Sequence, residues 1–271
     1  MAKKDCPLCG GSGWKTVERN GTRVAVRCDC VPDDREERVF ERARIPRRYE
    51  PCTFANFDLN LYDAEPDAAA WNRSLEQAKL VVQAFARDYP MSTEYGLLLM
   101  GPAGVGKTHL AVAALKEIVQ RGCDGLFYDY NELLKEIQHS YNPESQTTEM
   151  AVLEPVLDTP LLVLDDLGSS KPSAWALETV GHILNTRYNN NRLSLITTNF
   201  LDEDLLGPRG KERSGHVHSF PSGQTARAGE ETLAERIGQR VRSRLHEMCR
   251  TIQIVAPDYR REIHQARHGH R

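Results

Sequence analysis

The stretch that decides the fold is MGPAGVGKTHLA, residues 100–111. It follows the apolar run YGLLLM at 95–100 and opens the helical pattern KTHLAVAALKEIVQRG at 107–122. A glycine-rich loop between a strand and a helix, ending in Gly-Lys-Thr, is typical of a P-loop that binds the phosphates of a nucleotide. The residues expected to contact that nucleotide are Gly101, Pro102, Ala103, Gly104, Val105, Gly106, Lys107, Thr108 and His109.

The residue types of this loop suit a phosphate. Glycines let backbone N–H groups point at phosphate oxygens, and the N-terminus of the following helix adds a favourable dipole. We expect Lys107 to reach the β- and γ-phosphates and the Thr108 hydroxyl to complete the coordination of Mg²⁺. The alternative is a chance match in a loop, but the predicted strand and helix on either side argue against it.

Acidic and amide side chains end the later apolar runs. In PLLVLDDLG, residues 160–168, Asp165 and Asp166 follow a buried strand, at the edge where open α/β sheets bind ligands. We expect Asp165 to bind Mg²⁺ and Asp166 to orient or deprotonate an attacking water. Asn199 ends LSLITTN, residues 193–199, and its amide is suited to that water or to the γ-phosphate. For each residue the alternative is an ordinary strand end.

The rest of residues 50–271 alternates strand-like runs with helical segments, which predicts an α/β domain with a parallel sheet. Further strands are predicted at 124–130 and 251–255, and helices at 131–141 (capped by Asn131), 173–191 and 232–250. Residues 206–231 are rich in Gly, Ser, Arg and His, and we predict a mobile insertion there.

Arginines recur along the predicted helix at 232–250. Arg236, Arg240 and Arg244 are four residues apart, which would place them on one helical face. Arginine stabilises the charge that develops on a transferred phosphoryl group, from the same subunit or from a neighbour. The alternative is a basic, solvated helix face. Arg260, in PDYRRE, is a second candidate for the same role.

The composition indicates a soluble globular protein, since 27% of the 271 residues are charged and 40% are hydrophobic. The net charge of -3 gives no overall sign of nucleic-acid binding. No apolar run is long enough to cross a bilayer, and MAKKDCPLCG lacks the apolar stretch of a secretory signal. We therefore expect a cytoplasmic protein, whose seven cysteines are metal ligands or buried thiols rather than disulfides.

Four cysteines lie in residues 1–49, as Cys6-x-x-Cys9, eighteen further residues, and then Cys28-x-Cys30. This spacing favours a tetrahedral structural zinc site. A segment with so few apolar residues would also fold poorly without a metal. The alternative, a redox-active Cys-x-x-Cys pair, is expected near a βαβ pattern rather than before one. A charged helix that starts near Pro32 and ends at Pro46 is predicted to link this segment to the rest.

Together these motifs resemble the DnaC/DnaI/IstB group of AAA+ ATPases over roughly residues 45–262, the insertion excluded. The stretches that carry the resemblance are IPRRYEPCTFANFD (45–58), GLLLMGPAGVGKTHLA (96–111), LLVLDDLG (161–168), RYNNNRLSLITTN (187–199), ERIGQRVRSRLHEMCRTIQI (235–254) and DYR (258–260). The resemblance implies an AAA+ P-loop three-layer fold with a parallel central sheet over residues 50–271. The cysteine-bearing residues 1–49 are similar to DnaI-type helicase loaders, whose N-terminal domain binds zinc and the helicase.

The resemblance also implies a role for each motif. The implied roles are Walker A for Lys107 and Thr108, Walker B for Asp165 and Asp166, sensor 1 for Asn199, the trans-acting arginine finger for Arg244 and sensor 2 for Arg260. Many AAA+ enzymes have Glu where this chain has Asp166. The shorter side chain suggests slow hydrolysis, as in a switch.

The implied function is that of an ATP-dependent loader of the hexameric replicative helicase onto single-stranded DNA, with ATP, Mg²⁺ and Zn²⁺ as cofactors. Such proteins form an ATP-dependent oligomer around the DNA, which residues 126–155 would face. Lys135, Tyr128 and Tyr130 are candidate DNA contacts, although the tyrosines equally suit the core. The alternatives are an IstB-type helper of DNA transposition and a nucleotide-dependent binding module with negligible hydrolysis.

Overall fold

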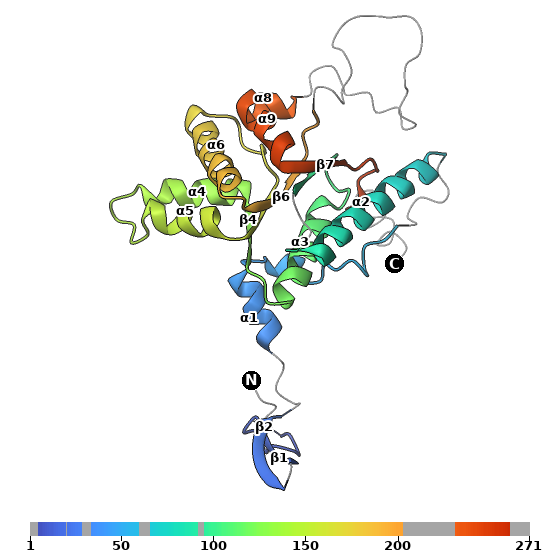
Figure 1. Cartoon of the computed structure of the whole chain (residues 1–271), viewed down its shortest axis with the longest axis vertical. Helices are drawn as coiled ribbons and strands as arrows, with labels where there is room; N and C mark the ends of the chain where they lie inside the picture. Colours follow the sequence, from blue (N-terminus) through green and yellow to red (C-terminus); the bar gives the residue numbers. More distant parts are fainter. Residues whose placement is uncertain are drawn as a thin grey trace, which may run out of the picture. The chain divides into compact units, whose positions relative to one another are not determined.

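The computed structural model describes residues 5–19, 21–28, 34–59, 66–91, 95–202 and 231–260 (Figure 1). The chain divides into two compact units, Met1–Glu41 and Arg42–Arg271. Cys30 and the predicted insertion, apart from its last residue Glu231, lie outside the described residues. Among the helices that are described, none has the length and apolar character needed to span a bilayer.

The first unit contains a β-hairpin of β1 (Trp14–Arg19) and β2 (Thr22–Arg27), which pair antiparallel with Trp14 opposite Arg27. The sequence Asn-Gly at 20–21 is a typical two-residue hairpin turn, a signal that our sequence analysis missed. Helix α1 (Asp34–Arg42) follows. It ends before Pro46, as predicted. Among the described residues of this unit few apolar side chains are buried, and two of them are cysteines, Cys6 and Cys28.

The second unit is built on a five-stranded parallel sheet with the strand order β4-β5-β6-β3-β7. The strands are β3 (Gly96–Met100), β4 (Gly125–Asp129), β5 (Leu161–Asp165), β6 (Leu193–Thr198) and β7 (Cys249–Gln253). Strands β3 and β5 are buried along their whole length, as expected for apolar runs covered on both faces. The structure therefore confirms the predicted parallel sheet.

Helices cover both faces of this sheet and complete a three-layer fold (Figure 1). Helices α2 (Ala68–Asp88) and α3 (Lys107–Gln120) pack together on one face. Helices α4 (Tyr130–Ser140), α5 (Glu149–Asp158) and α6 (Ala174–Asn189) lie on the other. The short 3₁₀ helix η1 (Arg47–Tyr49) precedes α2. Our sequence analysis identified neither α2 nor α5, and it misplaced one cap: Asp129, not Asn131, caps α4, since the helix begins at Tyr130.

The predicted helix at 232–250 is in fact two helices followed by a strand. Helix α8 (Leu233–Ile237) ends at Gly238, and α9 (Gln239–Met248) begins after it. Gly238 has φ 81° and ψ 149°, a conformation that breaks the helical path and that glycine adopts readily. The prediction that Arg236 shares a helical face with Arg240 and Arg244 is therefore wrong.

Candidate nucleotide-binding site

The loop between β3 and α3 is shaped by glycines. Gly104 and Gly106 have φ values of 79° and 91°, in the left-handed region that other residues rarely adopt. A Cβ atom added at Gly106 would come within 2.5 Å of Phe57 Cε2, and one at Gly104 would overlap the Asp258 carboxylate. The loop therefore requires glycine for its backbone angles and for the close approach of its neighbours.

Lys107 is the first residue of α3 and is buried, with 6% of its surface exposed. Its Nζ donates to the carbonyl oxygens of Gly101 at 2.8 Å and Pro102 at 2.7 Å, and to Asn199 Oδ1 at 2.7 Å. Burial lowers the pKa of Lys107 to about 8, although three neighbouring carboxylates act in the opposite direction. The structure thus brings together the predicted Walker A lysine and the predicted sensor 1 amide, which are 92 residues apart.

The Asp165 carboxylate accepts hydrogen bonds from two threonine hydroxyls. Thr108 Oγ1 lies 2.9 Å from Asp165 Oδ1, and Thr197 Oγ1 lies 2.6 Å from the same oxygen. Burial raises the pKa of Asp165 to about 6, while the two hydroxyls act to lower it. Carboxylate and hydroxyl oxygens are the ligands that Mg²⁺ prefers, so Thr108 and Asp165 fit this ion. Sequence analysis missed Thr197, because a threonine within a strand is usually a packing residue.

Asp166 follows the strand with φ 58°, a left-handed conformation that costs roughly 1 kcal/mol for a residue other than glycine. Its backbone N–H donates to Thr197 Oγ1 at 2.9 Å, and its carboxylate Oδ1 accepts from Asn199 Nδ2 at 2.5 Å. Burial, with a contribution from Asp129, raises the pKa of Asp166. The turn brings Asp166 to the same cavity as Asp165, although successive strand side chains normally point to opposite faces.

These side chains line one cavity of about 520 Å³, which is within the usual range for a small-molecule site. His109 lines it, with its ring nitrogen 2.8 Å from the Thr53 carbonyl oxygen and its pKa lowered by burial. Arg260 also lies in the lining. Sequence analysis gave no role to several lining residues, among them Arg48, Tyr49, Cys52, Phe57, Asp129 and Tyr259. Gly101 and Pro102 are not in the lining, but their carbonyl oxygens accept hydrogen bonds from Lys107 Nζ.

Arg244 is not among the residues that line this cavity. It lies on α9, where Nη1 donates to Glu247 Oε2 at 2.7 Å and Nε donates to Asn185 Oδ1 at 3.2 Å. Its guanidinium carbon lies 4.1 Å from the centre of the Tyr188 ring. Arg240, on the same helix, is exposed. In this conformation Arg244 does not serve the site of its own chain.

The two tyrosines considered as DNA contacts are core residues. Tyr128 is 4% exposed and Tyr130 is 2% exposed, so neither ring presents a face to a base. The Tyr128 hydroxyl accepts a hydrogen bond from Arg44, whose guanidinium also covers the ring. Of the two interpretations of these tyrosines, the structure therefore supports core residues and not stacking on DNA. Lys135 is exposed on α4.

In the first unit three cysteines form a cluster. The Sγ atoms of Cys6, Cys9 and Cys28 lie within 4.8 Å of one another, and those of Cys6 and Cys28 are 3.7 Å apart. A tetrahedron of sulfurs around Zn²⁺ has edges of about 3.8 Å, given Zn–S bonds of about 2.3 Å. The Gly13 N–H donates to Cys9 Sγ at 3.4 Å. The three thiols thus have the type and spacing of ligands for one metal ion, and the predicted fourth, Cys30, lies outside the described residues.

Comparison with known proteins agrees with the nucleotide-binding site described above. Residues 59–203, more than half of the chain, match the family described as IstB-like ATP binding protein. The phage-like element PBSX protein XkdC of Bacillus subtilis is 24% identical over 219 residues, which are 76% of this chain and 75% of XkdC. The replicative helicase loader DnaC of Escherichia coli K12 is 24% identical over 180 residues, which are 65% of this chain and 68% of DnaC.

A crystal structure of the DnaC helicase loader has the same fold. It matches with a TM-score of 0.55 and 30% identity, and the match covers 78% of this chain and 100% of that one. The chain therefore belongs to the IstB-like family of ATP-binding proteins, in the group that includes DnaC, and has the AAA+ P-loop fold.

Proposed function

We propose that this member of the IstB-like ATP-binding family is an ATP-dependent loader, which delivers a hexameric replicative helicase onto single-stranded DNA during replication initiation or restart. The observation that carries the proposal is the similarity to a DnaC helicase loader at 30% identity across the whole of that structure. The assembled cluster of Lys107, Asp165, Asp166 and Asn199 supports the ATP-dependent part. A loader of this kind works in the cytoplasm.

In the proposed site Lys107 binds the β- and γ-phosphates of ATP. Thr108 and Asp165 hold Mg²⁺, which supplies positive charge to the phosphate oxygens when bound. Asp166 orients the attacking water and accepts its proton, and Asn199 fixes the Asp166 carboxylate through their hydrogen bond. ATP is thereby hydrolysed to ADP and phosphate, slowly because the short side chain of Asp166 reaches less far than a glutamate.

Two arginines complete the proposed site. Arg260, which lines the cavity, contacts the phosphates of the same subunit as sensor 2. Arg244 contacts the γ-phosphate held by a neighbouring subunit, because its place on α9 is outside its own cavity. ATP binding therefore favours an oligomer. DNA runs along the surface of residues 126–155, where the exposed Lys135 pairs with a phosphate.

Residues 1–49 form the proposed helicase-binding domain, held by Zn²⁺ on the three clustered cysteines Cys6, Cys9 and Cys28. The sequence spacing adds Cys30 as the fourth ligand. The purified full chain should contain about one zinc per chain. Chelation should then expose the hairpin of β1 and β2 to rapid amide exchange while the parallel sheet keeps its protection. A redox-active pair would instead give no bound metal, together with a Cys6–Cys9 disulfide under mild oxidation. That result would remove the zinc proposal.

The test of the function is helicase loading with purified proteins. The full chain, ATP and the replicative helicase of the same cell are added to circular single-stranded DNA that carries an annealed oligonucleotide. Loading predicts that the chain binds the helicase and raises oligonucleotide displacement by about tenfold or more. Absence of both effects would overturn the proposal.

A second candidate is an IstB-type ATPase helper of DNA transposition, which the family match over residues 59–203 favours. This function needs the same ATP site but a transposase as partner. Capture of a transposase by the full chain, with no retention of the helicase, would select it. A nucleotide-dependent binding module, the remaining alternative, would bind ATP yet show no turnover with either partner present.

A further inference from the structure

The loop that carries Asp166 is a tight turn. The Ser169 N–H donates to the Asp166 carbonyl oxygen at 3.2 Å, and Gly168 between them has φ 84°. Strand β6 fixes the start of this turn, because the Leu167 N–H donates to the Thr197 carbonyl oxygen at 2.8 Å. The carbonyl oxygens of Gly168 and Ser169, at the end of the turn, accept hydrogen bonds from donors outside the turn.

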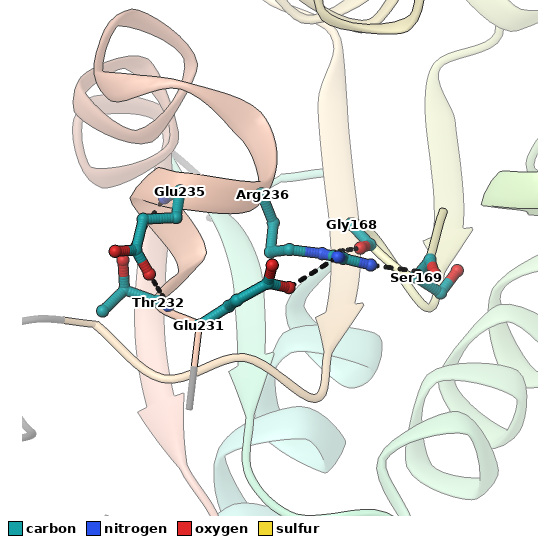
Figure 2. A network of polar contacts seen from close by, with 6 residues as sticks. All are labelled: Gly168, Ser169, Glu231, Thr232, Glu235 and Arg236. Atoms are coloured by element: carbon teal, nitrogen blue, oxygen red, sulfur yellow. Dashed lines mark hydrogen bonds and ion pairs between the residues drawn. The ribbon is translucent and has the colours of Figure 1, made fainter. Parts of the chain in front are cut away.

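Both donors come from one side chain, that of Arg236 on α8 (Figure 2). Its Nε lies 2.7 Å from the Gly168 oxygen and its Nη2 lies 3.0 Å from the Ser169 oxygen. Nη1 forms an ion pair with Glu231 at 2.6 Å, and the guanidinium carbon lies 4.6 Å from the centre of the Phe200 ring. Arg236 is 8% exposed, so its charge is buried but paired and hydrogen-bonded.

The backbone around Arg236 is also held in place. Thr232 and Glu235 form a capping box at the start of α8, with Thr232 N–H to Glu235 Oε2 at 2.7 Å and Glu235 N–H to Thr232 Oγ1 at 3.2 Å (Figure 2). The helix approaches the loop so closely that a Cβ atom added at Gly168 would lie 3.1 Å from Arg236 Cβ. Arg236 therefore has little freedom to move away from the turn.

We propose that Arg236 is a positioning residue for hydrolysis, which holds the turn after the Walker B acids so that the Asp166 carboxylate keeps its place beside Asn199. Arg236 is not in the cavity lining and touches no reacting group, so it acts only through the loop. The planar guanidinium matters because Nε and Nη2 bind two successive carbonyl groups while Nη1 pairs with Glu231, and the single ammonium group of a lysine does not reproduce these three separate directions. This inference rests on the proposed ATPase function.

The test compares Arg236→Gln and Arg236→Lys with a matched control, Arg121→Gln. Arg121 also donates to backbone carbonyl groups, those of Glu117 at 3.2 Å and Arg87 at 2.9 Å, but it follows the far end of α3. Both Arg236 variants should lower kcat by about tenfold to a hundredfold, with KM for ATP within about threefold, since a small displacement of a catalytic group has effects of this size. Arg121→Gln should change neither constant by more than about twofold.

A double variant separates a positioning role from a loss of stability. If Arg236 acts through Asp166, Asp166→Asn combined with Arg236→Lys should hydrolyse ATP no more slowly than Asp166→Asn alone. If the double variant loses kcat by the product of the two single losses, the inference is wrong. A kcat of Arg236→Lys equal to that of the wild type would overturn it as well. Arg236→Lys is used here because it keeps the buried charge near Glu231 and so favours folding.

Amide exchange distinguishes a failure of this inference from a failure of the proposed function. If the wild-type chain hydrolyses no ATP, the proposed function is wrong. Amide exchange in the Asp166 loop can still be measured in that case, with ADP bound. Arg236→Lys should then accelerate exchange at residues 166–169 by about tenfold while strands β5 and β6 stay protected. Unchanged exchange in this turn would overturn the positioning role whatever the activity.

Discussion

The two halves of the proposed ATP site are held by the chain in different ways. Lys107 is 6% exposed and has three hydrogen-bond acceptors within 2.8 Å, all from its own subunit. The side chain of Arg244, on α9, is 31% exposed and lies against Glu247 of the same helix and Tyr188 of α6. One cation is built into a cavity, whereas the other is held at the surface.

This difference indicates how nucleotide binding and hydrolysis are divided between subunits in the proposed function. An exposed ion pair such as that of Arg244 with Glu247 contributes about 0–1 kcal/mol, so a neighbour's phosphate can replace Glu247 at little cost. Lys107 is fixed where the phosphates of its own subunit would lie. In the proposed function, nucleotide binding is therefore a property of one subunit and hydrolysis is a property of two.

Replacement of Arg244 should give the largest effect. Arg244→Ala should lower kcat about 10³-fold, because an arginine supplied to the γ-phosphate contributes on this scale. Affinity for ATP, measured by titration calorimetry at a concentration where the chain is monomeric, should change by less than about threefold. Arg240→Ala, on the exposed part of the same helix, is the control. Equal losses in the two variants would argue against a specific role for Arg244.

Replacement of Lys107 should act on binding instead. Lys107→Ala should weaken ATP binding about 100-fold in the monomer, because a buried charge-assisted contact to the phosphates is lost. Calorimetry with ATP and with adenosine measures this loss, and adenosine affinity should stay within about twofold. An equal weakening for both ligands would show that the variant damages the whole cavity.

The pH dependence of binding is a smaller effect that belongs to the Lys107 half alone. Burial lowers the pKa of Lys107 to about 8, so in the empty site the Lys107 amine loses its positive charge as pH rises through this value. Phosphate binding requires the protonated amine, and ATP should bind about tenfold more weakly at pH 9 than at pH 7. Lys107→Arg should remove this dependence because guanidinium stays charged. A wild-type affinity that does not vary over this range would contradict the buried, shifted amine.

The smallest expected change comes from Glu247, which holds Arg244 in its own subunit. Glu247→Gln weakens the ion pair at 2.7 Å and should raise kcat by about twofold to threefold, since less energy is needed to transfer Arg244 to a neighbour. Steady-state hydrolysis measures the change. A fall in kcat as large as that of Arg244→Ala would mean that Glu247 is needed at the interface.

The sequence allowed the sheet and much of the site to be predicted, because both depend on local signals. Buried apolar runs predicted the strands, and the polar residues Asp165 and Asn199 at strand ends were assigned to the same nucleotide site as Lys107. Helix α2 was missed, although it is 21 residues long, and the break at Gly238 was missed because the helical pattern continues on both sides of it.

What was not predicted depends on contacts between distant parts of the chain. Tyr128 was considered a DNA contact, but it is covered by Arg44, 84 residues away. Arg236 was grouped with the arginines of α9, but it reaches Gly168, 68 residues away. A single side chain shows no periodicity that would reveal such partners, so these roles followed only from the structure.

The central claim, that hydrolysis occurs at a site shared by two subunits, is tested most directly by mixing two variants that each hydrolyse ATP very slowly. Asp166→Asn lacks the water-orienting carboxylate but supplies Arg244, and Arg244→Ala has the reverse defect. In an equal mixture, random assembly gives one interface in four with both residues, so hydrolysis should recover to roughly a quarter of the wild-type rate. A mixture no more active than the two variants measured separately would contradict the shared site.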